Sequence, residues 1–321
     1  MKVYQDLVKK HPSFRERSEN TDLSVEITLQ PYHAFKPDGV ILFSDILTPL
    51  TGMNIGFDIE EKAGPVIASP IRTMDRVKEI KPLDPDAACP FVGEALRILR
   101  NEVDPDTAIL GFVGAPFTLA TYIVEGGSSR DYTVIKNMMF QEPEVLHALL
   151  SSLAESIADY VRYQADNGAQ MVQIFDSWAA NLTPADFEMF AMPYIKQIVA
   201  SVKETHPDLP VTLYIFGSGG LLERMATFGG DCLSVDWTVD MVDARKRIGS
   251  VAPGLAVQGN MDPCVLFTDK ETIYRHVDEI IEKAGGLSSN HVFNLGHGVM
   301  QKTPEENVAH FFEAVRTAHQ R

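Results

Sequence analysis

Residues 39–47 read GVILFSDIL, a short apolar run that ends in a serine and a carboxylate. The four consecutive apolar residues 40–43 predict a strand that is buried on both faces. Asp45 follows this strand with apolar neighbours on both sides, and no Lys or Arg lies within seven residues of it. A carboxylate removed from water requires a cation or a hydrogen-bond donor. We therefore expect its partner to be distant in the sequence or to be a ligand.

The composition is typical of a globular enzyme and excludes two classes of partner. The chain has 321 residues, is 45% hydrophobic and carries a net charge of −16. Such an acidic balance argues against nucleic acid as a general partner. Because no apolar run approaches the ~18–20 residues that span a bilayer, we expect no integral membrane association. The three scattered cysteines form no CxxC pair, which indicates a reducing compartment.

Short apolar strands alternate with helical patterns along the chain. The predicted strands are residues 40–43, 108–113, 171–175, 211–216, 232–235, 255–258 and 292–295. This alternation predicts a parallel sheet. No Gly-rich fingerprint follows the first strand, so a (β/α)8 TIM-type barrel, as a single domain over 1–321, fits better than a dinucleotide-binding sheet. Seven strands are one short, and a helical segment opens the chain. We therefore expect the first barrel strand to lie upstream of Met1.

Candidate functional residues follow the predicted strands, where barrel enzymes place their chemistry. They are Asp45, Tyr122, Ser177 and His297, the last flanked by glycines that permit close approach of a ligand. Each also has a structural reading, namely an ion pair for Asp45, core packing for Tyr122, a turn cap for Ser177 and a loop position for His297. The glycine-rich residues 217–220 fit either an anion-binding nest or a tightly packed loop.

Two other kinds of site are weakly supported. Asp45, Ser177 and His297 could form a hydrolase triad, but Ser177 lacks the Gly-x-Ser-x-Gly context of a nucleophile elbow. A metal site is not expected, because the sequence has no His-x-x-x-His, Cys-x-x-Cys or His-x-Cys motif.

Five segments together resemble the uroporphyrinogen decarboxylase family. They are residues 43–47 (FSDIL), 114–127 (from GAP to EGG), 175–177 (FDS), 258–263 (QGNMDP) and 293–298 (FNLGHG), in the order of the family. Residues 11–19 resemble its plant and cyanobacterial branch. The resemblance implies a (β/α)8 barrel that works as a homodimer without cofactor or metal. It implies decarboxylation of the four acetate side chains of uroporphyrinogen III to coproporphyrinogen III in haem and chlorophyll biosynthesis. The implied location is the chloroplast stroma after transit-peptide removal in a plant, and otherwise the cytoplasm.

The resemblance also implies roles for individual residues. Asp45 would accept hydrogen bonds from the pyrrole N–H groups of the substrate. Tyr122, Ser177 and His297 would hold or polarise its carboxylates, so that Asp45, Tyr122 and His297 are the expected catalytic residues. The remaining expected substrate-binding residues are Phe14, Ile41, Phe43 and Ser44, of which the first three would line the apolar part of the cleft.

The sequence departs from the family at its start. The family carries Pro-Val-Trp-Leu-Met-Arg-Gln-Ala-Gly-Arg-Tyr before the segment that here begins at Met1, and its two arginines bind substrate carboxylates. We expect these residues upstream; a protein without them should have poor activity. Two alternatives remain, a zinc-dependent methyltransferase on the same barrel and a non-catalytic porphyrinogen-binding protein. The methyltransferase needs thiolate and histidine ligands, and neither Cys232 nor Cys264 has such a setting.

Overall fold

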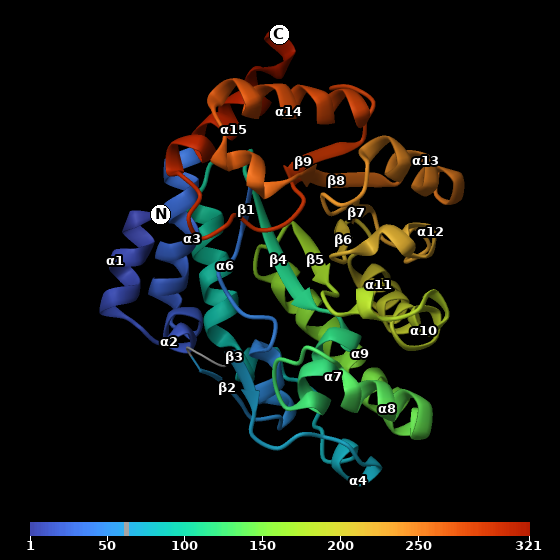
Figure 1. Cartoon of the computed structure of the whole chain (residues 1–321). Coiled ribbons are helices and arrows are strands. Elements are labelled where there is room, and N and C mark those ends of the chain that lie inside the picture. The colour runs from blue at the N-terminus through green and yellow to red at the C-terminus, as the bar shows by residue number, and fades with distance from the viewer. Residues whose placement is uncertain (61–63) are drawn as a thin grey trace.

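The computed structural model describes residues 1–60 and 64–321, and its centre is a curled sheet of seven parallel strands with helices around its outside (Figure 1). The order of the strands is β1-β4-β5-β6-β7-β8-β9, and every neighbouring pair is parallel. Their bounds are β1 Gly39–Ile41, β4 Ala108–Gly114, β5 Met171–Phe175, β6 Val211–Tyr214, β7 Cys232–Ser234, β8 Ala256–Met261 and β9 His291–Leu295. All seven predicted strands are confirmed, and the fold is of the TIM-barrel type.

Helices cover the outer face of the sheet (Figure 1). The α-helices are α1 Lys2–Lys10, α2 Phe14–Glu19, α3 Thr21–Phe35, α4 Met74–Val77, α5 Pro85–Ala88, α6 Pro90–Glu102, α7 Pro116–Glu125, α8 Thr133–Gln141, α9 Pro143–Asp166, α10 Pro184–Phe190, α11 Met192–Thr205, α12 Leu222–Met225, α13 Met241–Val251, α14 Lys270–Lys283 and α15 Glu305–Thr317. Short 3-10 helices are η1 Thr48–Met53, η2 Ala179–Asn181, η3 Ser218–Gly220, η4 Pro263–Phe267 and η5 Ala318–Gln320.

The longest helix, α9, forms the middle of the core. Its first turn contains Pro143, whose missing N–H costs nothing at that position. Leucines at positions 146, 149, 150 and 153 repeat with helical spacing and are fully buried. The helix packs against α7, α11 and β4. It therefore supports both α7, which carries Tyr122, and β4 inside the sheet.

Strand β1 corrects the expectation of a strand buried on both faces. Val40 and Leu42 are buried, but Ile41 between them is 44% exposed. Alternate residues of a strand point to opposite faces. Val40 and Leu42 belong to the main hydrophobic core, whereas Ile41 lines a cavity inside the curled sheet. An apolar side chain at a ligand cavity is indistinguishable in sequence from one in a core.

An antiparallel hairpin that the sequence analysis missed follows η1. Its strands are β2 Phe57–Glu60 and β3 Gly64–Ile67. Val66 pairs with Gly127 in the loop after α7, and the amide of Ile67 donates to the carbonyl of Gly126. The hairpin is thereby tied to the helix that carries Tyr122.

The curled sheet is open between its two outermost strands. Among the described residues, β1 pairs only with β4 and β9 pairs only with β8. A cavity of about 480 Å³ lies between these two strands, bordered by Gly39 of β1, Phe293 of β9 and Phe312 of α15. Within the part of the chain that is described, no helix is long and apolar enough to cross a membrane.

Candidate active site

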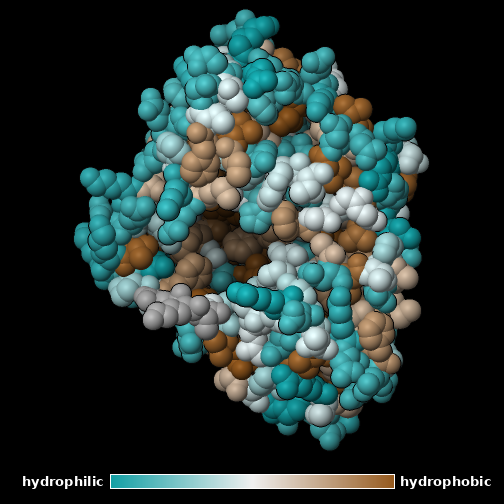
Figure 2. All heavy atoms as spheres, viewed as in Figure 1, coloured by the Kyte–Doolittle hydropathy of each residue, from teal (hydrophilic) through white to brown (hydrophobic). Residues whose placement is uncertain are grey.

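A cavity of about 550 Å³ lies inside the curled sheet, and strands from β1 to β9 contribute to its wall. Its lining comprises Gly39, Ile41, Leu110, Gln173, Phe175, Ser177, Tyr214, Ser234, Gln258, Asn294, Leu295, His297 and Gly298. Figure 2 shows a hollow in this region, with hydrophobic residues in its depth. None of the lining residues is Lys or Arg, and the polar side chains of the described wall carry amide, hydroxyl and imidazole groups.

The cavity brings together three of the predicted site residues from distant parts of the sequence. Ile41 comes from β1, Ser177 from the loop after β5 and His297 from the loop after β9. The His297 ring is exposed, and three aromatic rings stand at right angles or steeply to it. They are Tyr214 at 6.3 Å, Phe216 at 5.4 Å and Trp237 at 5.9 Å between ring centroids. The imidazole is therefore held on an aromatic platform facing the cavity.

Asp45 lies half-buried in the loop after β1. Its Oδ1 accepts a 2.7 Å hydrogen bond from the amide of Leu47, and no ion pair joins it to a cation among the described residues. Burial raises the pKa of Asp45; the Leu47 amide opposes this shift, and the negative charge of Glu19 adds to it. The donor to Oδ1 is thus close in sequence, whereas a distant partner or a ligand was expected; Oδ2 has no hydrogen-bond partner among the described residues and is available to a donor.

Tyr122 is a neighbour of Asp45 and stands on α7. Burial, together with the negative charge of Asp45, raises the pKa of Tyr122 to about 12, against an opposing interaction with Trp178. The Trp178 ring meets Tyr122 edge-on, with 5.8 Å between centroids. The phenol therefore keeps its proton at neutral pH and can donate a hydrogen bond.

The other predicted residues form an aromatic wall near Asp45. The rings of Phe14 and Phe43 lie 5.4 Å apart, and Tyr4 lies 6.2 Å from Phe43. Ser44, next to Asp45, has its hydroxyl 3.4 Å from that of Thr48. Phe14, Phe43, Ser44, Asp45 and Tyr122 are not among the residues that line the 550 Å³ cavity itself. The predicted site residues thus form two groups, one in the cavity and one around Asp45.

Sequence reasoning missed the polar row inside the sheet. The Gln258 amide nitrogen donates to the Gln173 side-chain oxygen and to the Ser234 hydroxyl, both at 3.0 Å. The three residues belong to β8, β5 and β7 and line the cavity. A polar residue within an otherwise apolar strand is the signal that could have identified them. Tyr214, Phe216 and Trp237 offered no such signal, because aromatic residues are common in ordinary cores.

The glycine-rich loop 217–220 is organised by a protein carboxylate. Backbone amides of Gly217 and Ser218 both donate to Asp236 Oδ2, at 2.9 and 3.1 Å. Asp236 is fully buried and also accepts from Thr238. The two amides that a ligand anion would need are therefore occupied, and the loop is held by an internal acid.

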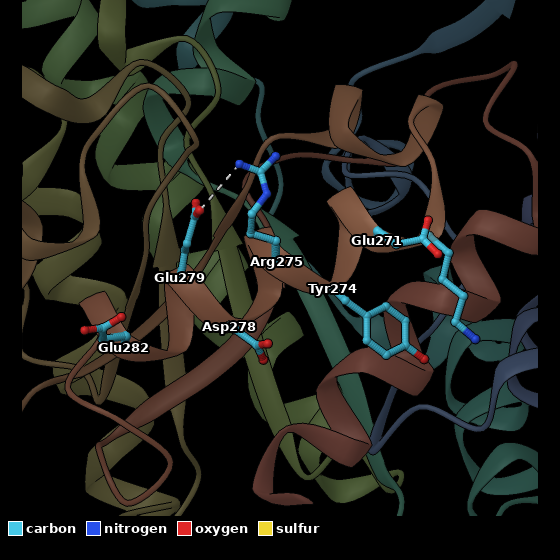
Figure 3. A pocket seen from close by; sticks show the side chains of 7 residues that line it. Glu271, Tyr274, Arg275, Asp278, Glu279 and Glu282 are labelled. Carbon is cyan, nitrogen blue, oxygen red and sulfur yellow. Dashed lines mark ion pairs between the residues drawn. The ribbon is translucent and has the colours of Figure 1, made fainter. Parts of the chain in front are cut away.

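A second hollow, of about 530 Å³, lies on the outside of α14 (Figure 3). Its volume does not distinguish it from the cavity inside the sheet. Its wall is a single helix rich in charged residues, including Glu271, Arg275 and Glu279, the last two 3.9 Å apart. Enzyme sites on parallel barrels lie where the strands end, and this hollow has no strand in its wall.

Metal-ligating side chains do not gather in the described residues. No group of three or more His, Cys, Asp or Glu side chains there has a metal-site arrangement. Cys232 is buried in β7, and burial raises its thiol pKa to about 12; Cys264 is exposed in η4.

The parallel, curled sheet and the polar side chains around the 550 Å³ cavity inside it define an α/β barrel enzyme. In this class the chemistry takes place at the ends of the strands. The chain belongs to the uroporphyrinogen decarboxylase (URO-D) family, which it matches over residues 1–318. It is 62% identical to a chloroplastic uroporphyrinogen decarboxylase of Oryza sativa, covering 98% of this chain and 80% of the relative. It is 59% identical to the enzyme of Parasynechococcus marenigrum, covering 98% and 88%.

Among solved structures, a methyltransferase from Methanosarcina mazei superposes with a TM-score of 0.78, covering 98% of this chain and 90% of that one. The two sequences are 21% identical, so this likeness shows the shared fold alone.

Proposed function

We propose that this protein is a carboxy-lyase that converts uroporphyrinogen III to coproporphyrinogen III by removing its four acetate carboxyls as CO2. Residues 1–321 belong to a single barrel domain of this enzyme. Membership of the family and the 62% identity to a plant enzyme support this reaction. The observation that carries the mechanism is a half-buried carboxyl, Asp45, whose described partner is the amide of Leu47.

Decarboxylation needs a place for the electrons of the breaking carbon–carbon bond. A proton first adds to the pyrrole ring and leaves it cationic. The bond to the carboxylate then breaks, CO2 departs, and the electron pair neutralises the ring. A second proton adds to the exposed methylene carbon and forms a methyl group, which makes the ring cationic again. The ring then releases the proton that it took up first, so one proton is consumed for each CO2 that leaves. A fixed carboxylate stabilises the cationic ring more than the neutral substrate, so the binding energy acts on the transition state.

Asp45 supplies that carboxylate. Its Oδ2 is free to accept from the pyrrole N–H groups, while Leu47 holds Oδ1. Burial keeps water from competing with these donors. Because the carboxyl is fixed in place before substrate arrives, little reorganisation is needed as the charge develops.

The other groups bind the periphery of the substrate. Tyr122, whose phenol stays protonated, donates to a carboxylate, as does Ser177. His297 on its aromatic platform holds or polarises another. Phe14, Ile41 and Phe43 contact the apolar tetrapyrrole, with Ser44 at the edge of this group.

The two alternatives have no specific observation in their favour. The methyltransferase likeness is at 21% identity, against 57–62% for several uroporphyrinogen decarboxylases of plants and cyanobacteria. A non-catalytic binding protein would have no need for a half-buried carboxyl with one oxygen left for a donor.

We also propose that the protein is a homodimer, and that it acts in the chloroplast stroma in a plant or in the cytoplasm otherwise. The family resemblance supports the homodimer, and the chloroplastic relatives from rice and maize support the location in the plastid. Sedimentation velocity at micromolar protein tests the first statement, and a single species of monomer mass would contradict it. A fluorescent fusion carrying the natural leader tests the second, and exclusion from plastids in a plant would contradict it.

Anaerobic incubation with uroporphyrinogen III tests the activity. We expect porphyrinogens with seven, six, five and finally four carboxyl groups to appear in sequence, separated by chromatography after oxidation. Persistence of the eight-carboxyl substrate alone, in protein shown to be folded, would contradict the proposed reaction.

A further inference from the structure

Asp176, the residue before Ser177, is completely buried and has no assigned role. It directly follows β5 and is 0% exposed. Its Oδ1 accepts a 2.7 Å hydrogen bond from the hydroxyl of Thr118, whereas its Oδ2 is buried without a partner among the described residues. An acid in such a place costs stability, because burying a carboxyl is unfavourable. Its presence therefore needs an explanation beyond packing.

The bonds around Thr118 have a fixed direction. Trp178 donates its backbone N–H to the Thr118 hydroxyl oxygen at 3.1 Å. A hydroxyl has one proton, and that proton goes to Asp176. Asp176 and Trp178 thus both bond to one side chain in the first turn of α7. Ser177 lies between these two residues, so the two hydrogen bonds hold it against α7. The bonds join residues that are 58 and 60 positions apart in the sequence.

The same helix carries Tyr122 one turn after Thr118. Residues four apart lie on one face of a helix, so Thr118 and Tyr122 point in similar directions. The Trp178 ring packs edge-on against Tyr122 at 5.8 Å and lies 5.6 Å from Tyr132. Trp178 is therefore fixed to α7 twice, through its backbone at Thr118 and through its ring at Tyr122.

We propose that Asp176 and Thr118 are positioning residues that lock the loop after β5 onto α7 and so set the distance between Ser177 and Tyr122. Both are fully buried and neither lines the 550 Å³ cavity. The inference rests on the proposed function, in which Ser177 and Tyr122 hold carboxylates of the same substrate. Two carboxylate-binding groups on separate elements must keep a fixed spacing, and the Thr118 hydroxyl provides it.

The role requires an acceptor at Oδ1 and no negative charge. Burial raises the pKa of Asp176 to about 7, against the opposing bonds from Thr118. An amide in place of the carboxyl keeps an oxygen acceptor of the same geometry. Asp176→Asn should therefore preserve the lock, whereas loss of the Thr118 hydroxyl should break it.

The test compares Thr118→Val with Thr118→Ser in the purified full chain. Valine keeps the shape and removes both bonds; serine keeps them. Thr121→Val is the matched control, because Thr121 is equally buried on α7 but donates within its own helix, to the carbonyl of Phe117 at 2.8 Å.

We expect Thr118→Val to raise KM for uroporphyrinogen about tenfold or more, as loss of a buried hydrogen bond to a binding element does. We expect KM values within about threefold of wild type for Thr118→Ser, Thr121→Val and Asp176→Asn.

Fluorescence supplies a readout that activity does not. The chain has two tryptophans, and a Trp237→Phe background, used for spectroscopy alone, leaves Trp178 as the only emitter. Thr118→Val should shift and broaden the Trp178 emission, whereas Thr121→Val should not. If Thr118→Val does not fold, Thr118→Ala carries the same comparison.

Two further variants separate this inference from the proposed function. Unchanged KM and Trp178 emission in folded Thr118→Val, with raised KM in Tyr122→Phe and Ser177→Ala, would overturn the inference and leave the carboxylate-binding roles standing. Wild-type kinetics in Tyr122→Phe and Ser177→Ala would remove those roles, and the inference with them.

Discussion

The hydroxyl of Tyr214 donates a 3.0 Å hydrogen bond to the carbonyl oxygen of Gly296, across the inside of the curled sheet. Tyr214 ends β6 and Gly296 follows β9, and strands β7 and β8 lie between these two strands in the sheet. Gly296 directly precedes His297, whose ring also stands 6.3 Å from that of Tyr214. One side chain thus holds both the backbone and the ring of the imidazole loop.

Tyr214→Phe should loosen this loop while keeping the aromatic contact. Because the lost bond positions a proposed carboxylate-binding group, we expect KM to rise by about three- to tenfold with a smaller change in kcat. Steady-state kinetics with uroporphyrinogen measure this split. Tyr32→Phe is the control, since Tyr32 is equally buried but donates to Asp104, on the outside of the sheet. A KM increase in the control as large as that in Tyr214→Phe would contradict a local effect.

Gly296 itself should not tolerate a side chain. A Cβ there would lie 2.3 Å from the backbone nitrogen of Trp237, so one of the two loops would have to move. We expect Gly296→Ala to lower the free energy of unfolding by about 1–3 kcal/mol, as overpacking does, and to lower kcat/KM. Gly298→Ala is the matched control, because a Cβ at Gly298 would meet nothing within 4 Å. Urea unfolding that gives equal midpoints for the two variants would contradict the steric argument.

The pH dependence of turnover should report the ionisation of Asp45. Burial raises its pKa, with the Leu47 amide opposing, and the proposed reaction needs the ionised form. The ionised fraction falls as pH falls through this pKa, so kcat should decline on the acid side at a pH above about 3.9, the ordinary value for Asp. Rates measured at decreasing pH, with circular dichroism confirming folding at each point, test this. A decline of kcat that begins only at or below the ordinary pKa of Asp would show that the carboxyl is not desolvated.

Stability should fall as pH rises from about 4 to about 7, because the carboxyl of residue 176 ionises in the unfolded chain before it does in the folded chain. Its pKa is raised to about 7 by burial, so at intermediate pH the folded chain holds a proton that the unfolded chain has released. The stability from this proton is present at low pH and is lost as pH rises toward about 7. The loss is at most about 4 kcal/mol, at 1.4 kcal/mol per pKa unit. Asp176→Asn should therefore gain stability relative to wild type between about pH 5 and about pH 8. Urea unfolding measures the difference in the free energy of unfolding between Asp176→Asn and wild type. The same difference at both pH values would contradict a protonated Asp176 in the folded chain.

The strands, and the location of several candidate residues just after them, could be predicted because their signals are local. Apolar runs marked the seven strands, and Asp45, Ser177 and His297 were identified at strand ends. The hairpin of β2 and β3 was missed because two four-residue strands give little pattern. Strand β1 was expected to be buried on both faces, yet Ile41 faces the cavity, since an apolar wall and a core look alike in sequence.

The positioning contacts could not be predicted, because each joins residues far apart. The Thr118 hydroxyl reaches Asp176, 58 residues on, and the Tyr214 hydroxyl reaches Gly296, 82 residues on. The occupied amides of the 217–220 loop likewise depend on Asp236, which lies in the loop after β7. Such contacts depend on how the sheet curls and which loops it brings together, and no local pattern contains that information.

The most direct test of the account is turnover of uroporphyrinogen III by Asp45 variants under anaerobic conditions. Asp45→Asn keeps the size of the side chain and an acceptor for Leu47 but removes the charge, and Asp45→Ala removes both. Asp45→Glu keeps the charge at a shifted position. We expect no detectable products from Asp45→Ala, a loss of at least about a hundredfold in Asp45→Asn, and measurable residual turnover in Asp45→Glu. Near-wild-type rates in both Asp45→Ala and Asp45→Asn would contradict the central role of this carboxylate.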